Sequence, residues 1–463
     1  MSRFGSNAPT IGRKQGLIGA IRVRLSPSAP SSLALISLKV LNTALSAISN
    51  FVLAYVLVRA IGLNSYAVMA SLLAIAALVV QSDLGITGLT FFQLRSHYLG
   101  ETGKYGASQD DQDLVTTIVS IYIAVGVISV AVLGLTLVIG LVQVAPHRVA
   151  YLLIFAGAVC ALPRMALRVA INARDGFVWT EAVDLGRRVA LLVATVAMLL
   201  GLSFISYAAL SLLVWILFIG ALIWLARSYG FAPRRGAFLR GLRLLRSELR
   251  GVGATVLLSL VDFVVSVFPY YLLAAARDAT AIVAFDMFYK VTRFAVISYL
   301  IGAETVLPHQ TRAVHNKDAA ELGRATAKGF LVGLVPMTSG IAAIALFGEN
   351  IFDVILNHNG IVSPVMRVAI CAMLAFMLIQ TTSQIVLIGV GKFEELARRA
   401  SITFAGMVMI STLTIIFHWS IDAFIVAYVV IYGAGSLLYA ECLYSLSRSL
   451  RSKNSRQDAP VET

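Results

Sequence analysis

Apolar runs long enough to cross a bilayer recur along nearly the whole chain, separated by short polar links. A membrane-spanning helix needs about 20 predominantly apolar residues, and the sequence contains twelve such runs. The apolar residues form continuous runs rather than stripes with a helix or strand period. The pattern predicts an all-α polytopic membrane protein with spans near residues 33–58, 66–94, 114–142, 149–172, 182–202, 204–226, 250–275, 281–306, 329–348, 366–390, 400–417 and 421–445.

The polar links divide these spans into two halves. The longest basic link, residues 227–250, separates six spans in residues 33–226 from six more in residues 251–445. Residues 1–32 form a basic arm without the cleavage-type site of a signal peptide, and residues 446–463 form a tail. Many transporters consist of two related halves, so we expect two six-helix lobes around a central cavity.

Composition agrees with this organisation. Of the 463 residues, 59% are hydrophobic and 13% are charged, whereas soluble domains carry roughly 25% charged residues. The net charge of the chain is +14. Nucleic acid is nevertheless not an expected partner, because few charges lie outside the apolar runs. Cys160, Cys371 and Cys442 lie singly in apolar stretches. No spacing of Cys and His residues indicates a metal site.

Basic residues predict the orientation of the chain. If the amino terminus is inside, 30 of the 37 Lys and Arg residues fall in inner segments and only four fall in outer links. Cytoplasmic segments of membrane proteins carry the excess of Lys and Arg. Both termini are therefore expected in the cytoplasm.

The link at residues 227–250 carries its own pattern. Phe238, Leu242, Leu245 and Leu249 recur at helical spacing among several arginines. One interpretation is a basic amphipathic helix that lies on the anionic inner leaflet. The other is an ordinary connector whose charge only follows the orientation rule.

Ionisable residues inside the spans are candidates for function. Each costs roughly 3 kcal/mol when it faces lipid near the bilayer centre, so they are expected to face one another or a wet cavity. Four of them lie along one face of the span 281–306, and polar stripes on spans 33–58 and 250–275 complete the predicted lining. The candidate cavity residues are Lys39, Asn42, Asp83, Asp262, Asp286, Lys290, Arg293 and Glu304.

Several of these residues also have a structural interpretation. Asp286 and Lys290, four residues apart, can form a neutralising pair, and Lys39 can extend toward the membrane surface. Asp83 interrupts its span beside Gly85, where it can cap a restarted helix. Arg293 is harder to explain structurally, because arginine does not lose its proton in proteins.

A polar cluster at residues 380–384, Gln-Thr-Thr-Ser-Gln, lies in the middle of the span 366–390. Such side chains commonly hydrogen-bond between membrane helices and hold them together. They can also line a ligand site. Both interpretations stand.

A short motif follows the first span. Residues 59–67 read R-A-I-G-L-N-S-Y-A and resemble the R-x-L-G-x-x-x-Y-G signature of polysaccharide exporters in the MATE-like multidrug/oligosaccharidyl-lipid/polysaccharide (MOP) flippase superfamily. Ala67 stands where that family usually has glycine. Residues 83–85, D-L-G, resemble the element that follows the signature, and Leu307-Pro308 at the end of the span 281–306 also fits.

The resemblance implies a flippase of the bacterial inner membrane. It would translocate undecaprenyl-diphosphate-linked oligosaccharide, by alternating access between two lobes, for exopolysaccharide or O-antigen-type export. The implied partners are the lipid-linked glycan, membrane lipids and the polysaccharide polymerase and export machinery. Lys39, Lys290 and Arg293 suit an anionic diphosphate as donors. Asp262 and Glu304 can hold a coupling H+ or Na+, and no other cofactor is expected.

Two other functions stay open. A multidrug exporter of the same superfamily would share the fold, although basic residues deep in the span 281–306 do not suit an organic cation. A membrane polysaccharide polymerase or ligase would be an enzyme, and such proteins usually carry their acids on a sizeable outer domain. The longest outer link, residues 349–365, is short, and no nucleotide-binding GxxxxGK[ST] loop is present. The prediction is a transporter rather than an enzyme.

Overall fold

The computed structural model describes residues 32–81, 83, 85–100, 107–139, 147–232, 236–248, 253–276, 279–357, 360–390 and 392–457. Over these residues the chain is almost entirely helical and contains no strand, as the apolar pattern predicts. The long helices are α2 (Ser32–Ile61), α3 (Leu63–Gln81), α4 (Ile86–Gly100), α5 (Gln109–Ile139), α6 (Arg148–Val159), α7 (Ala161–Asn172), α8 (Phe177–Ala197), α9 (Phe204–Ser228), α10 (Ala237–Glu248), α11 (Gly253–Ser266), α12 (Phe268–Ala276), α13 (Ala279–His315), α14 (Ala319–Leu356), α15 (Pro364–Gly389), α16 (Phe393–Phe417) and α17 (Ile421–Gln457).

Each of the twelve predicted spans corresponds to one helix or to one broken helix. Within the described residues, nine segments are long and apolar enough to cross a membrane by length and composition alone. The three remaining predicted spans correspond to α8, to α11 with α12, and to α13. Two of these, α8 and α13, carry several charged residues each, which lowers their mean hydropathy. Charged side chains are therefore concentrated in α8 and α13, which are less apolar than an ordinary membrane span.

Besides the break at Val267 between α11 and α12, two of the spans are broken inside the bundle. One break follows Gln81, and Asp83 stabilises the restart because its carboxylate accepts hydrogen bonds from the Thr87 amide at 3.0 Å and the Thr87 hydroxyl at 2.8 Å. The capping interpretation of Asp83 is confirmed by this geometry. The other break lies at Cys160, between α6 and α7. Pro163 in the first turn of α7 lacks an amide donor, which is tolerated at a helix start.

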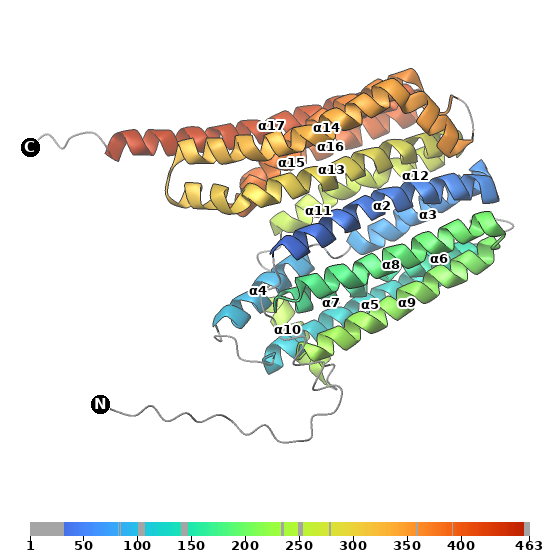
Figure 1. Cartoon of the computed structure of the whole chain (residues 1–463), viewed down its shortest axis with the longest axis horizontal. Coiled ribbons are helices and arrows are strands. Elements are labelled where there is room, and N and C mark those ends of the chain that lie inside the picture. The colour runs from blue at the N-terminus through green and yellow to red at the C-terminus, as the bar shows by residue number, and fades with distance from the viewer. Residues whose placement is uncertain are drawn as a thin grey trace, which may run out of the picture.

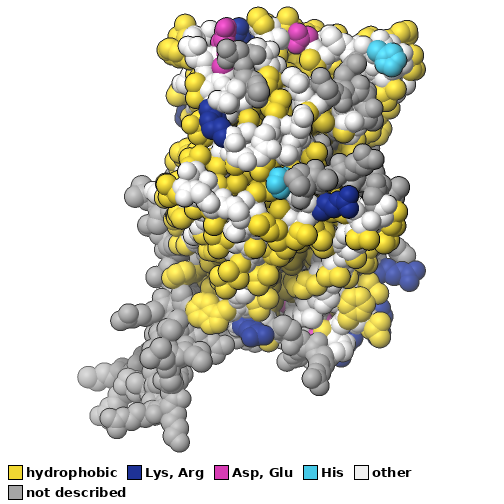
Figure 2. Space-filling view, turned by 90° about the vertical axis from the view of Figure 1, so that its right-hand side faces the viewer, with side chains coloured by type: hydrophobic (Ala, Val, Ile, Leu, Met, Phe, Trp, Pro, Cys, Tyr) yellow, Lys and Arg dark blue, Asp and Glu magenta, His cyan; other side chains and the backbone are white. Residues whose placement is uncertain are grey.

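The helices form two lobes. Helices α2 to α9 make the N-lobe and α11 to α17 make the C-lobe, with α2 and α3 lying along the boundary between them (Figure 1). We call the end where α2 begins and α17 ends the inner end, and the end where α2 meets α3 the outer end. Figure 2 shows the outer end, where apolar side chains dominate and charged side chains are few. This agrees with the predicted scarcity of basic residues in the outer links.

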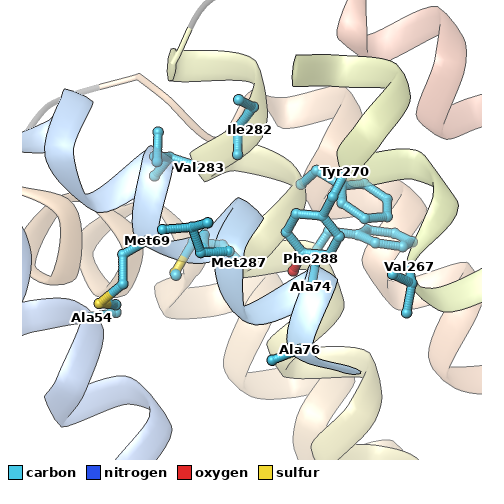
Figure 3. Packing of buried hydrophobic residues seen from close by; sticks show 14 of the residues in the cluster. Ala54, Met69, Ala74, Ala76, Val267, Tyr270, Ile282, Val283, Met287 and Phe288 are labelled. Carbon is cyan, nitrogen blue, oxygen red and sulfur yellow. The ribbon is translucent and has the colours of Figure 1, made fainter. Parts of the chain in front are cut away.

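The apolar core continues across the lobe boundary. Figure 3 shows Met69 of α3 and Ala54 of α2 lying next to Met287 and Val283 of α13. All four side chains are buried and belong to one continuous cluster. The two lobes are therefore in direct apolar contact at this level of the boundary.

Helix α10 occupies the basic link and packs against the N-lobe. It lies against the inner part of α5, and Ala237, Gly241 and Leu245 are buried there. A Cβ atom at position 241 would overlap the backbone of Asp113, so glycine allows the close approach. Arg240 donates to the Asp113 carboxylate at 2.6 Å, and this hydrogen bond raises the pKa of the Arg240 guanidinium.

The large apolar residues of the link do not all lie on the same face of α10. Leu245 packs inward, whereas Phe238 and Leu242 stay exposed. Leu249 and Arg250 lie outside the described residues. The helix is held to the N-lobe by a small-residue stripe, because only small side chains allow the backbones of α10 and α5 to approach closely.

Candidate transport site

A network of charged side chains fills the inner half of the N-lobe. Arg164 of α7 holds Asp184 of α8 in a two-pronged ion pair, with Nε 2.7 Å from one carboxylate oxygen. Arg168 lies one turn further along α7 and pairs with both Asp184, at 3.1 Å, and Glu181. The two carboxylates, Glu181 and Asp184, lie within about three turns of the start of α8. The two arginines and the two carboxylates are here named the N-lobe charge network.

Further side chains complete the network. Asn42 of α2 donates to the Glu181 carboxylate at 2.7 Å and to the Glu181 carbonyl at 2.9 Å. Arg187 has its Nε 3.8 Å from Asp184 and its guanidinium 4.1 Å from the ring centre of Trp215. Arginine stacks readily on aromatic faces. The Asn42 amide ties α2, at the lobe boundary, to the centre of the N-lobe.

The network carries a surplus of positive charge. Four arginines, Arg164, Arg168, Arg187 and Arg188, surround only two carboxylates. Among the described side chains, Arg188 has no ion-pair partner, and its Nε is buried without a hydrogen bond. The carboxylates themselves are buried, with Asp184 4% exposed. Arg188 is half-buried, and a partly buried cation without a close partner is stabilised by a nearby anion.

The sequence interpretation placed these four arginines with the inner links and missed their role. Arg164 and Arg168 precede the short link after Asn172, and Arg187 and Arg188 follow it. The helix α8 begins at Phe177 rather than near residue 182. A signal was nevertheless present. Residues 164 and 168 are one turn apart, and residues 181, 184 and 188 share one face of a helix. Ion-pair spacing on two consecutive helices indicates a buried network more than a solvated link.

The outer half of the lobe boundary is closed by polar contacts. The Tyr66 hydroxyl of α3 donates to the Asp286 carboxylate of α13 at 2.5 Å, and Tyr270 of α12 donates to the other oxygen at 2.8 Å. Lys290 binds the same carboxylate at 2.5 Å and also contacts the Tyr66 hydroxyl. Asp286 is buried. The structure therefore shows the neutralising pair that the four-residue spacing predicts.

Arg59 adds a second contact between the lobes at the outer end. Its guanidinium donates to the carbonyls of Val354 at 2.8 Å and Ile355 at 3.3 Å, where α14 ends. The last carbonyls of a helix lack partners within the helix, so a cation is favourable there. Gly62, with φ of 81°, provides the left-handed turn from α2 to α3. We call this set of contacts at Arg59, Tyr66, Asp286 and Lys290 the outer seam.

The C-lobe contains a polar cavity of about 130 Å³ between α11, α13, α15, α16 and α17. Asp262 and Arg293 line it and are exposed, while Thr381, Thr403 and Tyr439 are buried in its wall. Among the described residues, Arg293 has no carboxylate within ion-pair distance. Asp262 accepts a hydrogen bond from Gln81 of α3 at 2.8 Å, across the lobe boundary.

Part of the polar cluster at residues 380–384 belongs to this cavity. Gln380, Thr381 and Gln384 line it, whereas Thr382 and Ser383 lie on a different side of α15. Gln380 also accepts a hydrogen bond from Ser436 of α17 at 3.1 Å. The cluster thus provides both a contact between helices and the lining of a cavity.

Several solved structures have this arrangement of helices. An inward-facing multidrug resistance MATE family transporter of the MOP superfamily has a TM-score of 0.60 at 14% identity, over 94% of this chain and 99% of that one. A MOP superfamily transporter from Pyrococcus furiosus, described as having a binding pocket of reverse polarity, has a TM-score of 0.60 at 12% identity, over 90% and 96%. The chain has the MATE transporter fold.

A third MATE structure agrees. The Vibrio cholerae MATE transporter VcmN in the bent form has a TM-score of 0.59 at 16% identity, over 91% of this chain and 98% of that one. No family model and no curated relative matches the sequence. These likenesses establish the fold and, with the apolar helices, a multi-pass membrane protein. The MATE fold by itself does not specify a substrate, which has to be argued from the side chains.

The MATE fold places the predicted site residues in different surroundings. Asn42 joins the N-lobe charge network, and the buried Asp83 accepts a hydrogen bond from Tyr122 inside the same lobe. Asp262 and Arg293 line the C-lobe cavity.

Besides Asp83, three predicted site residues lie outside the network and the cavity. Asp286 and Lys290 form part of the outer seam. Lys39 lies half-buried on α2, one turn before Thr43, whose hydroxyl donates to the Lys39 carbonyl at 2.9 Å. The side chain of Glu304 lies outside the described residues.

Proposed function

We propose that this protein is a flippase that moves an undecaprenyl-diphosphate-linked oligosaccharide from the cytoplasmic to the periplasmic leaflet for polysaccharide export. The observation that carries the proposal is the surplus of fixed positive charge in the polar interior. Four arginines meet two carboxylates in the N-lobe charge network. Arginine binds phosphate oxygens through a planar fork of donors, so these positions suit a diphosphate.

The outer seam supports a transport cycle with two end states. Its contacts join α2 and α3 of the N-lobe to α13 and α14 of the C-lobe on the outer side. Release of a substrate to the outside requires these contacts to separate. In an alternating-access cycle, the polar groups of the seam would then exchange their partners for water or for substrate.

The motif that resembles the polysaccharide exporters lies in this seam. Arg59 and Tyr66 are its first and last polar positions, and both side chains reach across to the C-lobe. The resemblance therefore involves residues that join the moving parts. This supports a shared mode of action more strongly than a motif in an isolated loop would.

Energy coupling, location and partners stay predictions. We expect H+ or Na+ to drive the cycle, and no other cofactor. The expected location is the bacterial inner membrane with both termini cytoplasmic.

Reporter fusions after Arg148 and after Arg250 should report outside and inside. The polysaccharide polymerase and export machinery are the expected protein partners, and the chain is proposed to transport its substrate rather than catalyse a reaction on it.

Multidrug export is the second candidate. It is favoured by the solved structure described as a multidrug resistance MATE family transporter. An organic cation would meet the positive surplus of the N-lobe charge network, and like charges repel strongly in a medium of low dielectric constant. The two candidates therefore predict opposite preferences for substrate charge.

The test is transport by the purified full chain in proteoliposomes. A short lipid-linked oligosaccharide is placed in one leaflet, and its appearance in the other is followed with a membrane-impermeant lectin. A fluorescent organic cation is offered to the same vesicles in a separate assay. The proposal expects the glycan to change leaflet at a rate well above that in protein-free vesicles, and no uptake of the cation.

A matched pair of variants connects the result to the arginines. Arg188→Gln removes a charge that has no ion-pair partner among the described residues, and Arg324→Gln removes a charge that is 70% exposed on α14. Removing a hydrogen bond to a charged group costs about 1.5–3 kcal/mol, so Arg188→Gln should slow glycan transport about tenfold or more. Arg324→Gln should not change it. Transport of the cation but not of the glycan would show that the multidrug alternative is correct.

A further inference from the structure

The C-lobe cavity is separate from the cationic network and differs from it in charge. Its two charged side chains are one acid, Asp262, and one base, Arg293. A bare cation would be repelled by the fixed charge of Arg293, and a bare anion would be repelled by Asp262 when it is ionised. The charge balance therefore favours a neutral ligand that can both donate and accept hydrogen bonds.

The rest of the lining has the same character. The amides of Gln380 and Gln384 and the hydroxyls of Thr381, Tyr432 and Tyr439 each supply donors and acceptors. Such groups match a ligand with many hydroxyls, since each ligand hydroxyl also donates one hydrogen bond and accepts others. The aromatic rings add flat apolar surface, which suits the C–H face of a sugar ring.

One buried group in the wall lacks a partner. The Thr403 hydroxyl is buried without a hydrogen bond, and Thr403 is 5% exposed. Leaving a buried hydroxyl unpaired costs about 1–3 kcal/mol. This oxygen has almost no accessible surface, so it does not open into the cavity, and hydrogen bonds to a ligand would come from the other lining groups.

The size and position of the cavity restrict the ligand further. A volume of about 130 Å³ is small for a ligand site, since small-molecule sites usually span about 300–1,000 Å³, so the cavity excludes an oligosaccharide and admits at most one small polar unit. Asp262, in its lining, is also the residue that Gln81 of the N-lobe contacts across the boundary. Occupancy of the cavity is thereby linked to the relative position of the lobes.

We infer that the C-lobe cavity is a subsite for one neutral sugar unit. The identification of that sugar as part of a transported lipid-linked glycan rests on the proposed function. In this arrangement the arginines of the N-lobe charge network bind the diphosphate, and the amide and hydroxyl groups of α15 and α17 bind one sugar. The subsite contributes to selection among glycans that share the same lipid carrier.

The test is direct binding of free methyl glycosides to the purified full chain in nanodiscs. Methyl glucoside, galactoside, mannoside and N-acetylglucosaminide are compared by saturation-transfer NMR. We expect at least one of them to bind the unmodified protein. Thr381→Val and Gln384→Leu should weaken that binding about fivefold or more, because each removes hydrogen bonds to the ligand.

Thr382→Val is the matched control. Thr381 and Thr382 are adjacent on α15, both are buried, and only Thr381 lines the cavity. The control should bind the glycoside as the unmodified protein does. The inference is wrong if no glycoside binds, if the Thr381 and Thr382 variants behave alike, or if only sodium, measured with the radioactive ion, binds at this cavity.

Transport measured on the same preparation separates this inference from the proposed function. If a glycoside binds as expected and the lipid-linked glycan does not change leaflet, the sugar subsite stands and the flippase proposal is wrong. If the glycan changes leaflet and no glycoside binds, the flippase proposal stands and the sugar subsite is wrong.

Discussion

The two lobes have similar helix counts and very different interiors. The N-lobe interior is ionic, with arginines packed around the buried carboxylates of Glu181 and Asp184. The C-lobe interior is hollow and lined mainly by neutral hydroxyl and amide groups around its cavity. A shared architecture of six spans therefore does not lead to a shared site. The difference fits a ligand with a charged part and a neutral part.

The physical reason for the difference is that buried charges need close partners of opposite charge, whereas neutral polar groups do not. Charged groups in a low-dielectric interior must be paired closely, so the side chains of the N-lobe charge network contact one another directly. Neutral polar groups carry a smaller desolvation cost, so they can line an open space that water or a ligand fills. Removing a charge should therefore have different consequences in the two lobes.

The largest effect is expected for Asp184→Ala. This change leaves Arg164 and Arg168 without the carboxylate they share, and breaking a buried ion pair costs about 3–5 kcal/mol. Asp262→Ala, at an exposed position in the C-lobe, should cost less than about 1 kcal/mol. Thermal unfolding of the purified variants measures both. If the two variants lost equal stability, the interiors of the two lobes would not differ in how strongly their charges are paired.

Asp286→Ala should also destabilise the protein, at the boundary between the lobes. It leaves Lys290 in the outer seam without its carboxylate, at a cost of up to about 3–5 kcal/mol. We expect the amount of protein in the membrane to fall more than transport per molecule. Tyr66→Phe keeps the ion pair and loses one hydrogen bond, so it should cost about 1 kcal/mol. A normal amount of Asp286→Ala protein that does not transport would instead assign Asp286 to the substrate path.

Arg293→Ala should change activity more than stability. Arg293 is exposed in the C-lobe cavity and has no ion-pair partner among the described residues, so its loss leaves no buried charge behind. If it holds the part of the transported glycan that enters this cavity, glycan transport should fall about tenfold or more, with insertion into the membrane unchanged. Arg293→Lys should be intermediate, because lysine keeps the charge and loses the planar fork. Transport at the normal rate in Arg293→Ala would exclude this role.

The smallest effect is a difference in labelling rate. In a background without Cys160, Cys371 and Cys442, single cysteines are placed at positions 262, 290 and 293 in turn. A small water-soluble thiol reagent should react at 262 and 293, which are exposed, and slowly at 290, whose side chain is 16% exposed. Absence of reaction at both 262 and 293 would contradict a water-filled path to the cavity.

Much of the fold could be read from the sequence. Apolar runs of span length determine membrane helices because a bilayer leaves no other way to satisfy the backbone. The break at Asp83 and the pair at Asp286 and Lys290 were also predictable, since capping and i, i+4 pairing are local interactions. The resemblance at residues 59–67 implied a MATE-like fold, and the solved structures show that fold.

Only the tertiary structure showed which polar groups meet. Arg164 and Asp184 lie 20 residues apart, and Tyr66 and Asp286 lie 220 apart. Pattern analysis along one helix cannot determine such pairs, because they depend on how helices turn toward one another. For the same reason, the sequence could not distinguish Thr381, which lines the cavity, from Thr382 beside it. Sequence determined where polar groups enter the membrane, and packing decided whether each one meets an ion, a helix or an open space.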